Sequence, residues 1–491
     1  MKNRRRFTRI ISFVTLCCTM ALTFVLIPVN IFCVNFPEWI MVLFSALCCC
    51  GLIVYLTVFK IKTAAKIILP LVFGVSAVVC SFAPYLIPYW NSFSFKNYNG
   101  AVLNYDEVIS NEAAVEDLNA LIDHLKKVHP MFEGGLTEDV ENAYLQALDR
   151  LKTADTITVN ELRREIQSIL HLMYDAHTST YNNYPDDRYL KTVPQKSEES
   201  YYVMSINGKS VGQIFEDAKP YNCYETEDGI ILDLGSLASL DFYGYHAPFF
   251  FEWTDGENVI SEEYTEEDFV SWSEFLEIRN RYVPDNDKPL EFVSYEIDEE
   301  KSLAVLTLTQ CNYNQIYIDC VRSMFVEIMQ KDIQNVAVDL RGNGGGSSLV
   351  GNEFIRYLPV DHYFDGPYDW RWGFFHFHSS GKTRNRYYKD LMFDGNVYIL
   401  TDSESFSSAK DFAMLIQDNH LGKIIGEPSA NAVNGYGEIA AFYLPNTGLF
   451  VQISTKKWYR IDETNTDSYV MPDFPCGSQN AIEKLYEVIG Q

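Results

Sequence analysis

Basic side chains are scarce over most of this sequence. The chain has 491 residues, with 39 Lys and Arg against 66 Asp and Glu, and its formal net charge is −27. Eight of the basic residues but only one acid, Glu38, fall within residues 1–90. The rest therefore carries 31 basic and 65 acidic side chains, a net charge of −34. A surface this acidic repels phosphate backbones, which excludes nucleic acid as a partner.

Cysteine is too sparse beyond residue 90 to form a disulfide framework. Seven of the eleven cysteines precede that point, and only four follow it: Cys223, Cys311, Cys320 and Cys476. A single bridge, such as one between Cys311 and Cys320, remains open. None of the four follows a predicted strand and opens a helix beside a candidate base, so a cysteine nucleophile is not expected.

The glycine-rich segment lacks the spacing of nucleotide-binding loops. Residues 342–347 read Gly-Asn-Gly-Gly-Gly-Ser, which breaks the dinucleotide pattern, and no Gly-Lys-Ser/Thr follows. Metal spacing is also missing: His376 and His378 have no third ligand nearby, and strand alternation explains that pair. We therefore expect neither a cofactor nor a metal.

Three apolar runs dominate the N-terminal region, at 10–28, 39–59 and 67–90. Each has about the length that crosses a bilayer core, and a cleaved signal peptide would explain only the first. Basic residues before the first run and between the second and third place both segments in the cytoplasm by the positive-inside rule. The sequence thus predicts a multi-pass protein of the cell membrane, anchored in the lipid bilayer, with everything after residue 90 extracytoplasmic.

Periodicity divides the remainder into further parts. Residues 91–112 are predicted to form a linker, 113–188 a helical region with apolar residues at helix spacing, and 189–288 a small β-rich module. Asn207-Gly208 between apolar runs predicts a hairpin there. From 289 to 491, strands alternate with helices, which predicts an α/β core. The aromatic stretch 363–388 is interpreted as a lid or a wall beside the site.

Two predicted strands of that core end at groups suited to acyl transfer. The run at 336–338 leads through Asp339 into the glycine-rich loop, and the run at 397–400 leads into the serines at 403, 405, 407 and 408 before a predicted helix at 409–417. Open α/β sheets bind ligands at the carboxyl ends of their strands. A hydroxyl at a helix N-terminus beside free backbone N–H groups supplies both a nucleophile and an oxyanion site.

Three blocks resemble the tail-specific, or C-terminal processing, serine protease family, which includes the core of the tricorn protease. They are residues 339–345 (DLRGNGG), 405–409 (SFSSA) and 426–428 (GEP), followed by a closing Pro472-Asp473. Upstream, His129-Pro130 and residues 175–178 (DAHT) match the helical region before the family's core. The resemblance implies a crotonase-like ββα core for residues 289–491, and hydrolysis of protein or peptide substrates by a serine endopeptidase.

The resemblance also assigns the site residues. Ser407 occupies the position of the nucleophile, and backbone N–H groups of Gly344, Gly345 and Ser408 are the expected oxyanion donors. Many relatives carry a general-base lysine shortly after Gly-Glu-Pro, but residues 428–433 contain none. His177 is the predicted base, because the tricorn-like branch supplies its base from a segment like 175–178 and because imidazole titrates near working pH.

The partner of this base is less well defined by the sequence. Among the late acids Asp462, Glu463 and Asp467, Glu463 is the predicted orienting carboxylate. Lys410 offers a second base, because Ser407 and Lys410 form a Ser-x-x-Lys pair like that of penicillin-recognising enzymes, although the companion motifs of those enzymes are missing. A non-catalytic binding protein on the same fold is the remaining alternative.

Overall fold

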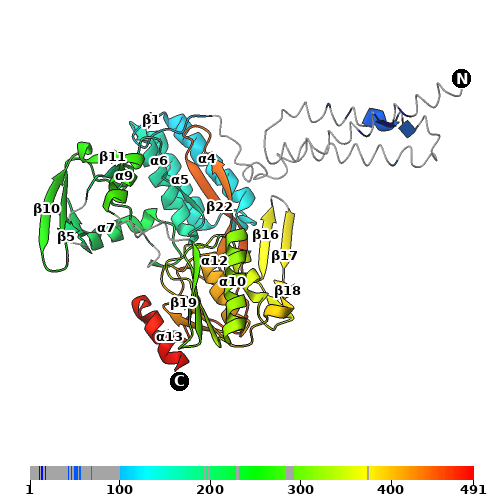
Figure 1. The fold of residues 1–491 in the computed structure, drawn as a ribbon. Coiled ribbons are helices and arrows are strands. Elements are labelled where there is room, and N and C mark those ends of the chain that lie inside the picture. The colour runs from blue at the N-terminus through cyan, green and yellow to red at the C-terminus, as the bar shows by residue number, and fades with distance from the viewer. Residues whose placement is uncertain are drawn as a thin grey trace.

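The fold is taken from a computed structural model. It describes residues 100–490 apart from 183, 193–194, 197–198, 228–229, 231, 283–291 and 373–374. Before residue 100 it describes only the helical positions 10, 13–14, 17, 43, 46, 49–53, 55–56 and 68. Figure 1 shows helices packed beside one sheet, a β-rich part on one side, and an α/β core that ends in the C-terminal helix.

The prediction of three N-terminal membrane-spanning helices is wrong. Within the described residues, no helix is both long and apolar enough to cross a membrane. The longest described helix, α4 (Asn111–Val128), has 18 residues but carries charges in its first and last turns. A span needs about 20 mostly apolar helical residues. Most of the three predicted spans lies outside the described residues.

Three further predictions depended on those spans and are corrected with them. The multi-pass localisation in the cell membrane and the lipid bilayer as a partner both required membrane-spanning helices, which the described residues do not contain. The extracytoplasmic side was inferred from an odd number of crossings, so it loses its basis as well.

The α/β core is built on a sheet in the order β12-β13-β14-β19-β20-β23. β12 pairs antiparallel with β13, and the other neighbours are parallel. The strands are Val293–Asp298, Leu303–Leu308, Asn335–Asp339, Asn396–Thr401, Lys423–Gly426 and Phe474–Pro475. The predicted alternation of strands and helices in this part of the chain is therefore present.

Helices cover both faces of this sheet, because its strands carry apolar side chains on both sides. Val336 and Val338 of β14 face a cluster that includes residues of the helices α10, α11 and α12. Ala337, between them, faces the C-terminal helix α13 on the other side. This is the near-continuous apolar run expected of a buried parallel strand. The helices are Gln315–Lys331, Leu349–Ile355, Ser408–Asp418 and Ala481–Ile489.

A second sheet joins the helical region to the core. Its order is β17-β16-β22-β21, and the short β3 pairs with β22. Apolar residues of α4, α5 and α6 share one buried cluster with β21 and β22. The strands are Phe375–Ser379, Tyr368–Trp372, Phe450–Trp458, Tyr436–Tyr443 and Ser179–Thr180, and the two further helices are Glu138–Thr153 and Val159–Leu170. Much of the aromatic stretch at 363–388 therefore forms strands: β16, β17, and the antiparallel pair of β15 (His362–Phe364) and β18 (Lys382–Arg384).

The β-rich part contains a sheet in the order β10-β9-β7-β8. The predicted hairpin at Asn207-Gly208 is present: Ser205 pairs with Ser210, and both turn residues have positive φ. Three helices, α7, α8 and α9, accompany this sheet. The strands are Val259–Tyr264, Phe249–Thr254, Tyr202–Ile206 and Lys209–Ser210, and the helices are Val211–Ala218, Leu237–Phe242 and Trp272–Tyr282.

Candidate functional site

Ser407 lies on a strained turn between β19 and α12. It is the N-cap residue of α12, with φ 53° and ψ −121°, a backbone conformation that L-residues rarely adopt. Its backbone N–H donates to Asn431 Oδ1 at 2.8 Å, and its carbonyl accepts the N–H of Asp411 at 2.9 Å. The backbone around the hydroxyl is thus held on both sides in the geometry of a nucleophile at a strand-to-helix turn.

Gly345 packs directly against this turn. A Cβ added there would lie 2.7 Å from the Cβ of Ser407 and 2.9 Å from the carbonyl oxygen of Phe406, and the φ of Gly345 is 98°. Only glycine fits such a position. The N–H of Gly345 already donates to Asn343 Oδ1 at 2.9 Å. The glycine-rich loop therefore supports the serine turn, and this particular N–H is occupied.

His177 reaches Ser407 from the helical region. Its Nε2 lies 3.0 Å from Ser407 Oγ, across 230 positions of sequence. The ring stacks on Phe406 at a centroid distance of 4.8 Å. The next residue, Thr178, accepts the N–H of Ser454 in β22 at 2.9 Å. Because β22 ties the histidine segment to the second sheet, the imidazole is positioned by packing and by backbone hydrogen bonds.

Asp175 is a fully buried anion behind the imidazole. One carboxylate oxygen, Oδ2, accepts from His129 Nε2 at 3.0 Å and from Thr178 Oγ1 at 2.6 Å, and the other, Oδ1, accepts the His177 N–H at 2.9 Å. His129 Nδ1 accepts the N–H of Met131, so the ring proton sits on Nε2. Burial disfavours the charge, but the hydrogen bonds from His129 and His177 outweigh it and hold the pKa of Asp175 well below its ordinary value.

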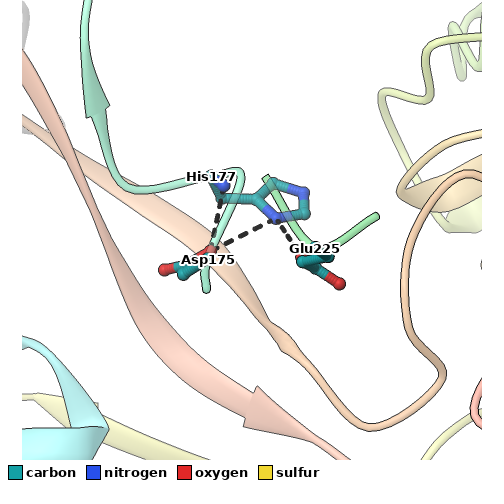
Figure 2. Close-up of side chains that lie close together, drawn as sticks. All are labelled: Asp175, His177 and Glu225. Carbon is teal, nitrogen blue, oxygen red and sulfur yellow. Dashed lines mark hydrogen bonds and ion pairs between the residues drawn. The ribbon is translucent and has the colours of Figure 1, made fainter. Parts of the chain in front are cut away.

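Glu225 approaches the same imidazole from the loop after α7. Figure 2 shows Asp175 and Glu225 on the Nδ1 side of the His177 ring, 3.7 Å and 3.9 Å from that nitrogen. Glu225 Oε2 accepts the N–H of Ala432 at 2.8 Å. Its Oε1 and the His177 Nδ1 are both buried, and neither has a hydrogen-bond partner among the described residues. A shift of less than 1 Å would join them directly, since such bonds form at about 3 Å.

The two carboxylates set the protonation of this cluster. Burial and the charge of Asp175 raise the pKa of Glu225 to about 7. Burial alone would lower the pKa of His177, but the nearby carboxylate of Asp175, with the charge of Glu225, raises it above its ordinary value. Because the two groups face each other, the protonation of His177 and that of Glu225 are coupled.

Two free backbone N–H groups lie beside the serine. Neither Ser408 N nor Gly346 N donates to an acceptor in the part of the chain that the structure describes, and both residues line the same cleft as Ser407. Ser408 Oγ donates to the Gly346 carbonyl at 2.9 Å, which holds these two residues together. Gly344 is exposed and does not line the cleft. Of the three predicted oxyanion donors, Ser408 thus has an unbonded N–H at the cleft, the N–H of Gly345 is occupied, and Gly344 lies outside the cleft.

Ser407 and His177 open into a cleft of about 570 Å³. Its other walls come from the first turns of α11 and α12, the loop at 431–435 and the start of β21. Ile439 and Trp458 contribute apolar surface, whereas Lys410, Asp411 and Glu438 contribute charge. A cleft of this volume accommodates a few residues of an extended polypeptide.

Two other predicted residues do not contact the imidazole. Glu463 is exposed on a turn and makes no contact with His177; Asp175 and Glu225 occupy the expected place of the orienting carboxylate. Lys410 is buried, but its ammonium donates to Asp411 Oδ1 at 2.6 Å rather than to Ser407. The sequence offered a signal for Asp175, because it lies within the segment 175–178 that resembles the family. Glu225 carried no local signal, because only the fold brings its loop to the site.

Among the residues that the structure describes, Asp175, His177 and Glu225 form the group of side chains that could hold a metal cation. Asp175, His177 and Glu225 offer one nitrogen and two carboxylate oxygens within 4.8 Å of one another. A metal on His177 Nδ1 would leave the proton of the neutral ring on Nε2, which could then not accept the proton of Ser407 Oγ. A metal and base catalysis by His177 therefore exclude each other here.

A hydroxyl on a strained turn, an imidazole within hydrogen-bond distance and free N–H groups together form the arrangement that serine hydrolases use. Residues 302–476, which include Ser407 but not His177, match Peptidase family S41. The predicted family is thereby confirmed for this segment: residues 302–476 belong to Peptidase family S41.

Solved structures share the fold at low sequence identity. Mature CPAF gives a TM-score of 0.54 at 14% identity, covering 77% of this chain and 96% of that one. Mature CPAF complexed with lactacystin gives 0.53 at 13% identity, covering 77% and 97%. At such identities the likeness concerns the fold alone. A search of curated proteins finds no sequence match.

Proposed function

We propose that this peptidase cleaves internal peptide bonds of protein or peptide substrates through an acyl-enzyme on Ser407. The observation that supports it most is the 3.0 Å approach of His177 Nε2 to Ser407 Oγ. A serine hydroxyl is a poor nucleophile without an adjacent base, and this imidazole is a base at the required distance.

In the first step Ser407 Oγ attacks the substrate carbonyl carbon while His177 Nε2 takes the hydroxyl proton. The N–H groups of Ser408 and Gly346 stabilise the oxyanion; the loss of one such donor typically costs about 2.7–4 kcal/mol of transition-state stabilisation. The imidazolium then protonates the leaving amine as the C–N bond breaks. A water molecule, deprotonated by the same nitrogen, attacks the ester and releases the acid and Ser407.

Asp175 and Glu225 act through His177 as positioning residues. The Asp175 carboxylate stays ionised because its pKa is held low, so it favours the imidazolium at every working pH. Glu225 adds a second negative charge that increases as the pH rises through about 7, the value to which its pKa is raised. The lysine used by many relatives is therefore replaced by a histidine with two carboxylates behind its Nδ1.

Labelling with a serine-directed phosphonate tests the nucleophile. The wild-type chain should bind one equivalent, and Ser407→Ala should bind none. Ser408→Ala is the matched control, because it removes a hydroxyl bonded to the Gly346 carbonyl but keeps the backbone N–H. His177→Ala should lose both labelling and peptide cleavage. Lactacystin is a second probe, because CPAF has been solved in complex with it.

The same experiment separates the alternatives. A folded wild-type chain that neither takes the label nor cleaves peptides would be a binding protein on this fold. Covalent capture of a β-lactam by Ser407, lost in Lys410→Met, would favour the Ser-Lys mechanism. The Lys410–Asp411 ion pair argues against that mechanism, since the ammonium of Lys410 already has a partner.

A further inference from the structure

A second, larger hollow adjoins the active-site cleft. It has a volume of about 1080 Å³ and lies between α11 and the pair β15 (His362–Phe364) and β18 (Lys382–Arg384). Leu349, the first residue of α11, lines both the cleft around Ser407 and this hollow. A polypeptide extended through the cleft past Leu349 would therefore enter it. We call the hollow the basic groove, for the charges that line it.

The charge of the groove is opposite to that of the protein. Its lining includes five basic side chains and only two acidic ones, Glu353 and Asp361. Glu353 is paired with Arg356 at 2.7 Å. The other four basic side chains have no ion-pair partner among the described residues, although acids outnumber bases about two to one beyond residue 90. These four are Lys382, Arg384, Arg386 and Lys389.

The segment that carries these cations is held in place by buried hydrogen bonds. Lys382, Arg384 and Arg386 alternate along an extended segment, so they project on one side of it, and all three are exposed. Asn385, between them, is buried and donates to the carbonyl of Ile355 at 3.0 Å. Further bonds join the Asn385 N–H to the Asp361 carbonyl and Arg356 Nε to the Arg386 carbonyl. The cations are thus displayed by a fixed backbone.

We propose that the basic groove binds an acidic segment of the substrate, so that the peptidase selects polypeptides with Asp or Glu residues some way from the cleaved bond. Three observations support this: unpartnered cations in an acidic protein, a fixed backbone that displays them, and a wall shared with the cleft. Desolvation is modest because the cations are exposed, so binding is electrostatic and depends on salt. The inference rests on the proposed function for its biological role, but binding can be measured without catalysis.

The test uses fluorescent peptides on the full chain carrying Ser407→Ala, which cannot cleave them. One peptide has a neutral core followed by a Glu-rich extension, and its partner has Gln in place of each Glu. We expect the acidic peptide to bind on the order of tenfold more tightly, a factor consistent with a few exposed ion pairs. The groove variant Lys382→Gln/Arg384→Gln/Arg386→Gln should abolish this preference. The matched control makes the same change of net charge on other exposed lysines, Lys126→Gln/Lys152→Gln/Lys191→Gln, and should retain it.

Three other outcomes of the binding test overturn the inference. Equal binding of the two peptides would show that the groove does not recognise carboxylates. Loss of the preference in the control variant would assign it to overall charge. Displacement of the acidic peptide by polyphosphate at equal charge concentration would mean that the groove binds any polyanion rather than a peptide. A failure of phosphonate labelling, with the binding preference intact, would instead contradict the proposed function and leave the groove assignment standing.

Discussion

The substitution Glu225→Gln tests the charge arrangement at the imidazole most directly. Glutamine keeps the size of the side chain and can still accept the Ala432 N–H, but it removes one of the two negative charges facing His177 Nδ1. The reaction requires unprotonated His177. The acid limb of the pH profile of kcat/KM therefore reports the protonation of His177 together with Glu225 in the free enzyme.

The direction of the change follows from the sign of the removed charge. An anion near the imidazole favours its protonated form, and Glu225 contributes to the raised pKa of His177. Its removal should therefore lower the pKa of the base and move the acid limb to lower pH. The Asp175 charge remains, because its pKa stays well below the working range, so the base should stay titratable in the variant.

The separation of 3.9 Å between Glu225 Oε1 and His177 Nδ1 sets the magnitude. Two unit charges at about 4 Å interact by about 1 kcal/mol in water and by about 4 kcal/mol at an effective dielectric constant of 20. With 1.36 kcal/mol per pKa unit, the acid limb should move down by roughly 1 to 3 pH units. A proton on Glu225, whose pKa is about 7, cancels part of this charge in the wild type and moves the expected shift towards the smaller figure.

The assay measures kcat/KM from about pH 5 to pH 9 with one peptide substrate. Glu438→Gln is the control: this carboxylate also lines the cleft but is paired with Lys456 at 2.9 Å. It should leave the acid limb in place, whatever it does to KM. An unmoved limb in Glu225→Gln, or a shift to higher pH, would refute the idea that this carboxylate sustains the base.

Three further substitutions test the site and its support. Gly345→Ala should reduce kcat at least tenfold while the chain still folds, because the added Cβ would lie 2.7 Å from the Cβ of Ser407 and displace the serine turn; phosphonate labelling rates measure this. Asp418→Ala should lower the free energy of unfolding by about 3–5 kcal/mol in a denaturant titration, because it leaves the buried Arg460 without its paired carboxylate. Glu463→Gln should change kcat/KM by less than about twofold, because this exposed acid contacts none of the site.

The α/β core was predictable because its patterns are local. Apolar runs such as 336–338 and 397–400 are recognisable as buried parallel strands from their own residues. The Asn207-Gly208 hairpin was likewise predictable, since a two-residue turn with positive φ favours that dipeptide. These features depend on the chain within a few residues of each position, and a single sequence contains that information.

The site was only partly predictable because its parts meet across long sequence separations. The pairing of His177 with Ser407 was inferred from a resemblance; no periodicity connects positions 230 residues apart. Glu225 lies in a loop without regular structure, and it becomes an orienting group only when β22 and the loop at 431–435 are in place. Gly345 was predicted as an oxyanion donor from the same resemblance. The structure shows instead that the loop turns this N–H towards Asn343.

The apolar N-terminal runs show the limit of an argument from hydropathy. A run of apolar residues determines the hydrophobicity of a segment. A membrane span also needs an unbroken helix of sufficient length. The described helices do not meet that requirement. Composition therefore predicted the surface charge of the part after residue 90 better than it predicted the structure of the beginning of the chain.

Surface charge and the basic groove act on an acidic substrate over different distances, and salt separates the two effects. The net charge of −34 beyond residue 90 repels an acidic peptide at long range, whereas the groove attracts it at contact. At about 0.01 M ionic strength the Debye length is about 30 Å and the repulsion extends across the molecule; at about 1 M it is about 3 Å and the contacts are screened too. Cleavage of a Glu-rich peptide should therefore have its highest kcat/KM near 0.1 M, while its Gln counterpart should show no such maximum. A steady fall from the lowest salt for the acidic peptide would mean that the groove outweighs the rest of the surface at every distance, and a steady rise would mean that the groove contributes nothing.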